Sequence, residues 1–324
     1  MGKASSEEDT LHEHLPTKVL LAIDGSKEAE LAARSAAALA DKTSSELHVV
    51  YVFGITPWYP AYPEAAGFDA AELENPVLAE DLQRISEQRA RELLDAEVEK
   101  LRSVGGTLAQ AHLVEGGVPE EIVGLAEEIG AGLVVVGSRG RGGIRRALMG
   151  SVSDSVVRHA HCPVLVVRDG ERERDYLPGR ILLAVDGSEE ASAATRTAVD
   201  LADRTDSELH VVHVGELKPV YHPERRGYLA RYEELQEEAR RLLEEQVDEI
   251  NSAGGSVSRA HLRIGRPDEE IVGLAEEIGA GLIATGSRGL GGMRRALMGS
   301  ASDSIVRHAH CPVLVVRPEK EQTA

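Results

Sequence analysis

The sequence predicts an α/β fold of two tandem, doubly wound, Rossmann-like domains, each built on a five-stranded parallel sheet. Three observations indicate it: short apolar runs alternate with helical stretches, the second half of the chain repeats the first, and the 324 residues are about twice a common domain length. Strands that alternate with helices form β-α-β units, so we expect helices on both faces of each sheet.

The internal repeat sets the domain boundaries. Lys18–Ser26 returns as Arg180–Ser188, and Glu120–Arg168 aligns without a gap to Glu269–Arg317, with 42 of 49 residues identical. The offset falls from 162 to 149 between these blocks, so the first half carries 13 additional residues near Phe53–Glu80, where prolines indicate a loop. We expect a tail over 1–16, a first domain over 17–168, a charged linker over 169–177, a second domain over 178–317 and a tail over 318–324.

Each element of the first half has its own signal. Val19–Ile23 is an apolar run ending in Asp-Gly-Ser, which predicts a buried strand and then a turn. Lys27–Lys42 is rich in Ala and Leu with acidic residues early, which predicts a helix, and Glu46–Phe53 is a Val-rich strand. A long helix follows and stops at Gly105-Gly106; in the second half its apolar stripe is Leu235, Ala239, Leu242 and Ile250.

The rest of the unit continues the alternation of strands and helices, for a total of five strands and four helices. Both halves share this pattern. In the first half we expect a strand over Thr107–Val114, a helix over Glu120–Gly130, a strand over Gly132–Val136, a helix over Ser151–His161 and a strand over Val164–Val167.

Charge and hydrophobicity exclude several classes of protein. A formal net charge of −19, from 55 acidic and 36 basic residues, repels a phosphate backbone and argues against a general nucleic-acid binder. No run approaches 18 apolar residues and Met1–Pro16 has no apolar core, so we expect neither a membrane span nor a secretory signal. With only two cysteines, the composition predicts a cytoplasmic protein.

A glycine-rich loop after the fourth strand carries the strongest chemical signal. Gly137 and Gly140 precede Gly150-Ser151, which opens a helix, and the second half repeats this spacing with Gly286, Gly289, Gly299 and Ser300. Glycines let a backbone approach a ligand closely, and the N–H groups at a helix start bind anions. The loop therefore fits a phosphate site with serine hydroxyls as donors; alternatively, the glycines only form turns and the serines only cap the helices.

Asp24 and Asp186 end the first strand of each half. Ligands of open α/β sheets bind at the carboxyl ends of strands, where the strand order reverses. If the first and fourth strands are neighbours, Asp24 and the loop from Gly137 face one crevice. The alternative is that each aspartate forms an Asx turn or a helix cap.

Together, the Asp-Gly-Ser strand end, the Gly-x2-Gly-x9-Gly-Ser loop and the closing Cys-Pro-Val-Leu-Val-Val strand resemble the universal stress protein family in its tandem form. The resemblance implies the strand order 3-2-1-4-5. It also implies that the halves pair through their last strands, Val164–Val167 and Val313–Val316, whose apolar edges favour pairing. Pairing of whole chains into a homodimer stays open.

The resemblance also implies a ligand, because this glycine loop marks the family members that bind ATP. Each half would hold one ATP, with Mg²⁺ on the phosphates. Ala22, Ile23 and Asp24 would line the first site, and the Val52 backbone would meet adenine. Ribose and phosphates would contact Val136, Gly137, Gly140, Gly150, Ser151 and Val152. The matching residues of the second half are Ala184, Val185, Asp186, Val214, Thr285, Gly286, Gly289, Gly299, Ser300 and Ala301, with Thr285 for Val136 the one polar difference.

Three other groups of residues are weaker candidates. His159, His161 and Cys162 resemble a metal cluster, but histidines two apart point to different sides of a helix, which favours a structural cysteine. Arg139, Arg145 and Arg146 either reach phosphates or are solvated charges. Trp58, Tyr59 and Tyr62 suit a partner contact, a lid or a loop anchor.

The expected function is ATP binding in a stress response or in signalling, with no committed reaction. One alternative is an enzyme that hydrolyses ATP slowly or forms adenylates, although the sequence has neither a Walker loop nor a Ser-Gly-Gly-x-Asp-Ser loop. The other is an interaction module whose pockets are vestigial.

Overall fold

The computed structural model describes residues 16–54, 76–103, 105–140, 149–168, 176–216, 225–289 and 298–318. Over these residues, ten strands form one continuous sheet in the order β3-β2-β1-β4-β5-β10-β9-β6-β7-β8. Neighbouring strands within each half are parallel. Each half therefore has the order 3-2-1-4-5, mirrored in the second, and the predicted fold class is confirmed.

The two halves have the same order of elements. The first comprises β1 (Lys18–Ala22), α1 (Lys27–Thr43), β2 (Glu46–Phe53), α3 (Pro76–Ser103), β3 (Leu108–Glu115), α4 (Val118–Ile129), β4 (Leu133–Gly137), α5 (Ser151–His159) and β5 (Val164–Val167). The second comprises β6 (Arg180–Ala184), α6 (Glu189–Thr205), β7 (Glu208–Gly215), α7 (Arg225–Ser252), β8 (Val257–Ile264), α8 (Pro267–Ile278), β9 (Leu282–Gly286), α9 (Ser300–His308) and β10 (Val313–Val316).

Most expected boundaries agree with these to within two residues. α3 differs more, because it begins at Pro76, inside the stretch expected to be a loop up to Glu80. Proline is favoured at a first helical position, where its missing N–H has no helical partner. α5 ends at His159 and not at His161, because Ala160 already has extended backbone angles (φ −58°, ψ 138°) ahead of Cys162-Pro163.

The expected apolar stripe of α7 lacks one residue that the structure buries. Leu243 is buried with Ala239 and Ile250, whereas Leu242 is only half-buried. Steps of four and seven residues from Ala239 lead to Leu243 and then to Ile250, which is the helical period. Because Leu242 and Leu243 are adjacent, the sequence alone fits either leucine to the buried face of the helix.

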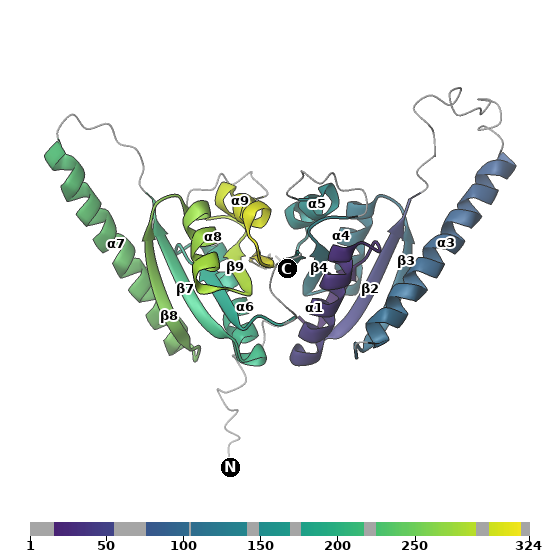
Figure 1. Ribbon diagram of the computed structural model, residues 1–324, viewed down its shortest axis with the longest axis horizontal. Coiled ribbons are helices and arrows are strands. Elements are labelled where there is room, and N and C mark those ends of the chain that lie inside the picture. The colour runs from purple at the N-terminus through teal and green to yellow at the C-terminus, as the bar shows by residue number, and fades with distance from the viewer. Residues whose placement is uncertain are drawn as a thin grey trace, which may run out of the picture.

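Helices cover both faces of the sheet. α1, α3, α6 and α7 pack on one face, and α4, α5, α8 and α9 on the other. Figure 1 shows the long helices α3 and α7 at the two outer ends and α5 and α9 near the middle. Each face has one apolar core that runs through both halves: Leu21 and Leu183 belong to the first, Val134 and Ile283 to the second. None of the described helices has the length and apolar character needed to cross a bilayer.

The two halves join at the centre of the sheet. β5 and β10 are antiparallel, with Leu165 opposite Leu314, and both strands are buried along their whole length. Burial of apolar strands that would otherwise be exposed edges stabilises this pairing. The predicted packing through the last strands is confirmed, and the chain forms an intramolecular pseudo-dimer.

Candidate functional site

The candidate site lies where the strand order reverses. β1 and β4 are neighbours, with Leu21 opposite Val135, so both strands end at the same edge of the sheet. A Cβ added at Gly140 would lie 2.5 Å from Asp24 Oδ2, so the carboxylate faces that glycine closely. In the second half, a Cβ added at Gly289 would meet Asp186 Oδ2 in the same way. The structure thus brings each aspartate and its glycine loop together, as the strand order predicts.

Each aspartate also organises the turn that follows it. Asp24 Oδ1 accepts a hydrogen bond from the Ser26 backbone N–H at 2.9 Å, which is an Asx turn. The helix cap belongs to Ser26, whose Oγ accepts from the Ala29 N–H at 3.1 Å. Asp186 and Ser188 repeat the turn and the cap. The Asx-turn interpretation therefore holds for one carboxylate oxygen, while the other faces the loop.

The two ends of the glycine loop are tied together by hydrogen bonds. The Gly150 N–H donates to Ser138 O at 2.8 Å, and Ser153 Oγ lies 3.0 Å from both Ser138 O and Gly150 O. In the second half, Ser302 Oγ donates to Gly286 O at 2.7 Å. Sequence reasoning missed these two serines, although both halves carry Ser-x-Ser-Asp at the helix start. Between these ends, residues 141–148 and 290–297, with Arg145 and Arg146, lie outside the described residues, as do Trp58, Tyr59 and Tyr62.

The helix that follows the loop starts without a side-chain cap. Gly150 is the N-cap of α5 and Ser151 is its exposed first residue, and Gly299 and Ser300 begin α9 in the same way. The alternative that Ser151 and Ser300 only cap their helices is therefore wrong. Gly150 has ordinary extended angles (φ −77°, ψ 152°), and a Cβ there would come no closer than 3.4 Å to any described atom. Among the described residues, neither its φ nor its packing demands glycine, although glycine is one of the favoured residues at an N-cap.

Gly137 is a different case. A Cβ at Gly137 would lie 2.9 Å from the Glu28 carbonyl carbon in the first turn of α1, and Gly286 meets Glu190 of α6 even more closely. Real Cβ contacts with backbone are essentially never this short, so packing of the helix against the strand end accounts for both glycines.

The apolar candidates divide between the two faces of the sheet. Ala22, Val52 and Val152 are half-buried at the rim of the core under α4 and α5. Ala184 and Val214 are half-buried at the matching rim under α8 and α9, and Ala301 is half-buried too. Val136 is buried in that core. The side chains of Ile23 and Val185 are buried in the opposite core, so only their backbone lies at the strand end. Thr285 is buried, and its hydroxyl donates to Gly286 O at 3.2 Å.

Arginines border the loop in both halves. Arg139 lies 3.3 Å from Glu28, and the corresponding Arg288 lies 2.8 Å from Glu190. Burial lowers the pKa of Arg168, and the positive charge of Arg139 lowers it further. Ser138 Oγ, beside Arg139, is buried and has no hydrogen-bond partner among the described residues. The loop therefore presents a cation and a buried hydroxyl next to an uncapped helix start.

The histidine–cysteine motif has a structural environment. Cys162 is buried, which raises the pKa of its thiol to about 12, so the thiol is protonated at neutral pH. His159 Nδ1 lies 2.8 Å from the Ser155 carbonyl of its own helix, and His161 lies 3.6 Å from Glu127. Within the described ranges, no three metal-binding side chains gather in one place.

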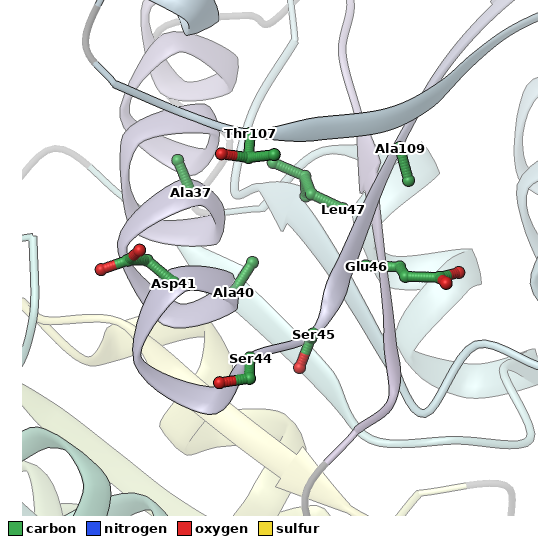
Figure 2. A pocket seen from close by; sticks show the side chains of 9 residues that line it. All are labelled: Ala37, Ala40, Asp41, Ser44, Ser45, Glu46, Leu47, Thr107 and Ala109. Atoms are coloured by element: carbon green, nitrogen blue, oxygen red, sulfur yellow. The ribbon is translucent and has the colours of Figure 1, made fainter.

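A hollow of about 350 Å³ lies at the opposite end of the sheet, where β2 begins. Figure 2 shows its lining side chains, which are Ala37, Ala40, Asp41, Ser44, Ser45, Glu46, Leu47, Thr107 and Ala109. Its charged lining residues are both acidic, so it would repel a phosphate. In the second half, the larger Val199 stands at the position of the lining residue Ala37. We therefore place the candidate site at Asp24 and not here.

Comparisons with known proteins agree with this architecture. A model of the universal stress protein family matches residues 16–168 and again 178–317. A universal stress protein of Mycolicibacterium smegmatis is 30% identical over 304 residues, which cover 93% of this chain and 97% of that one. A universal stress protein of Mycobacterium tuberculosis is 31% identical over 306 residues, covering 92% and 96%.

A solved structure extends the likeness to the arrangement of both halves. The crystal structure of a universal stress protein from Archaeoglobus fulgidus is similar over 93% of this chain and 98% of that one, with a TM-score of 0.64 at 23% identity. At this identity the likeness supports the fold alone. Because the family model matches almost the whole chain in two copies, the chain belongs to the universal stress protein family and carries two of its domains in tandem.

Proposed function

We propose that each domain binds one ATP with Mg²⁺ at the carboxyl ends of its first and fourth strands. The observation that carries the proposal is the start of α5 at Gly150, which has no side-chain cap and where neither φ nor any contact with the described residues demands glycine. A ligand that approaches the backbone closely explains a glycine there. The proposed contacts of the second domain are the matching residues from Ala184 to Ala301.

The phosphates are the part of ATP that the loop fits best. The first N–H groups of α5 lack partners within the helix, and the helix dipole gives them a positive partial charge. Gly140, Gly150 and Ser151 let the phosphates reach these groups, and Ser138 Oγ is a further buried donor. A Cβ at Gly140 would occupy space next to Asp24 that the ligand needs.

Mg²⁺ accounts for the carboxylate beside the phosphate loop. Asp24 and Asp186 would repel a bare triphosphate, whereas a divalent cation on the phosphates makes a nearby carboxylate favourable. We assign the nucleoside end to the half-buried rim of Ala22, Val52 and Val152, where the Val52 backbone meets adenine. Ile23 and Val136 contribute backbone, because their side chains are buried in the cores.

The proposal includes no committed reaction. ATP binding would serve a stress response or signalling in the cytoplasm, in keeping with the two free, buried cysteines, Cys162 and Cys311. Slow hydrolysis is the alternative that release of ADP or AMP would reveal. A vestigial interaction module is the alternative that absence of binding would reveal.

The test compares glycines at the starts of α5 and α9 with exposed glycines inside α4 and α8. Gly150→Ala with Gly299→Ala adds a methyl group at each helix start, where the shortest predicted contacts are 3.4 and 3.2 Å. Gly124→Ala with Gly273→Ala is the control, since these exposed helical glycines have no atom within 4 Å of the added Cβ. We expect the first pair to lower ATP affinity by about tenfold or more, equivalent to about 1.4 kcal/mol. The melting temperature should fall only modestly, because alanine is a poorer N-cap than glycine and the contact at Gly299 is tight. Unchanged ATP affinity in the first pair would contradict the proposal.

A further inference from the structure

Two arginines cross from one domain to the other next to the central strands. Arg168 directly follows β5, and its guanidinium donates to the carbonyls of Val306, Arg307 and Ala309 at the end of α9, with 2.6 Å to Ala309 O. Arg317 directly follows β10 and donates to Val157 O and Arg158 O of α5 at 2.8 and 2.7 Å. Each domain thus holds the last turn of a helix of the other.

These contacts take the place of a helix cap. The last carbonyls of a helix have no partner within it and carry negative partial charge. α5 and α9 have nine residues each, and their C-caps Ala160 and Ala309 are not in the left-handed conformation. Helices this short are not stable alone in water, so a guanidinium on the last turn contributes to their position.

The held helices are those whose first turns lie at the two candidate sites. α5 begins at Ser151 and α9 at Ser300, and each helix is about 13 Å long. Ion pairs across the domains support the same helices, since Asp154 in the first turn of α5 is 2.5 Å from Arg307. Asp303 of α9 pairs with Arg158 in the same way.

Each crossing arginine also lies beside the glycine loop of its own domain. The Ser138 N–H donates to Val167 O at 2.6 Å, so the residues before Arg139 and Arg168 are joined directly. Arg139 and Arg168 are close enough for their like charges to repel, as are Arg288 and Arg317. Arg168 therefore lies between the glycine loop of the first site and helix α9 of the second. Arg317 lies between the glycine loop of the second site and helix α5 of the first.

We infer that Arg168 and Arg317 are positioning residues that couple the two sites, so that ligand in one domain strengthens binding in the other. The inference rests on the proposed ATP sites. An anionic ligand at the loop offsets the repulsion between Arg139 and Arg168. Arg168 then holds α9 more firmly, and the first turn of α9 is fixed at the second site before its ligand arrives. The coupling is reciprocal, through Arg317 and α5.

The test asks whether ATP in the first domain alone stabilises α9 of the second. Gly289→Val blocks the second site, because the added side chain meets Asp186. Amide hydrogen exchange of this one chain is followed with and without Mg²⁺ and ATP, so any direct effect of the substitution on α9 is present in both measurements. We expect ATP to slow exchange in α5 and in α9 (300–308), and not in α8 (267–278). Adding Arg168→Met should abolish the effect on α9 and leave that on α5. Arg91→Met, on an exposed i,i+4 pair of α3, is the matched control.

Affinity gives a second measurement, and Arg168→Lys guards against a variant that fails to fold. In wild type the first site should bind ATP about fivefold more tightly than in the Gly289→Val chain, and Arg168→Met should remove that difference. Arg168→Lys keeps the charge but loses the forked donors, so its effect on α9 should be intermediate. If ATP slows exchange in α5 but not in α9, or slows it in α9 even with Arg168→Met, the coupling is overturned while ATP binding at the first site still holds. Protection of neither helix in any chain would overturn both proposals.

Discussion

Gly137 and Gly150 belong to the same loop, and only one of them is explained by packing. Gly137→Ala places a methyl group 2.9 Å from the α1 backbone, which has to move away from β4. We expect a loss of about 1–3 kcal/mol in the free energy of unfolding, measured by urea titration. Gly124→Ala, at an exposed position of α4, serves as the control and should leave the free energy of unfolding unchanged or raise it. Equal stability of Gly137→Ala and wild type would contradict the packing account.

A pair of histidines, one buried and one half-buried, occurs once in each domain. His48 Nδ1 lies 3.1 Å from His112 Nε2, and His210 and His261 repeat the contact at 3.1 Å. Burial lowers the pKa of His112, and His48 lowers it further, against an opposing effect of Glu128. The pKa of His261 is lowered by burial, then by His210 and two arginines, while Glu277 opposes this.

These shifts predict a loss of stability in mild acid. Because the pKa of each histidine is lower in the folded state, the unfolded chain takes up the proton first, and stability falls as pH drops below about 6.5. His112→Gln with His261→Gln should flatten the melting temperature between pH 7.5 and 5 relative to wild type. Exposed His159→Gln is the control, and an unchanged slope in the double variant would contradict the assignment.

At the scale of elements, the glycine loop depends on how β4 is joined to α5. Ser153 Oγ is the side chain that joins them, and it is buried. Ser153→Ala should cost about 1–2 kcal/mol of unfolding free energy, and should weaken ATP binding at the first site because the loop ends separate more easily. Ser155→Ala, in the same helix, is the control, because the Ser155 hydroxyl has only the His159 ring as a described hydrogen-bond partner. Calorimetric titration of both variants checks this; wild-type ATP affinity in Ser153→Ala would contradict it.

The sequence predicts elements well where local and repeated signals agree. β2 and β5 have the expected bounds, because their apolar runs are flanked by turns and helices whose signals occur in both halves of the sequence. The meeting of Asp24 with Gly140 follows from strand order, which the resemblance supplied. Leu243 of α7 is buried, and the sequence does not distinguish it from its half-buried neighbour Leu242, because adjacent leucines fit two helical phases. Ser153, Arg168 and the histidine pairs escaped notice because their partners come from distant or opposite segments, which no local pattern encodes.

At the scale of the whole molecule, the two domains share their cores. β5 and β10 are fully buried against each other, and both apolar clusters continue across them. Neither domain can unfold without exposing the central strand of the other, so we expect a single cooperative transition in scanning calorimetry, with equal calorimetric and van 't Hoff enthalpies. Two resolved transitions, as independent domains would give, would contradict a shared core.

The central claim is that each domain of this universal stress protein binds one ATP, and titration calorimetry of the full chain tests it most directly. The protein is first freed of bound nucleotide and then titrated with ATP in the presence of Mg²⁺. The account predicts a stoichiometry near two per chain, falling to about one in Gly289→Val or Gly140→Val. A stoichiometry near one in wild type would contradict the claim for one domain, and no binding at all would contradict it for both.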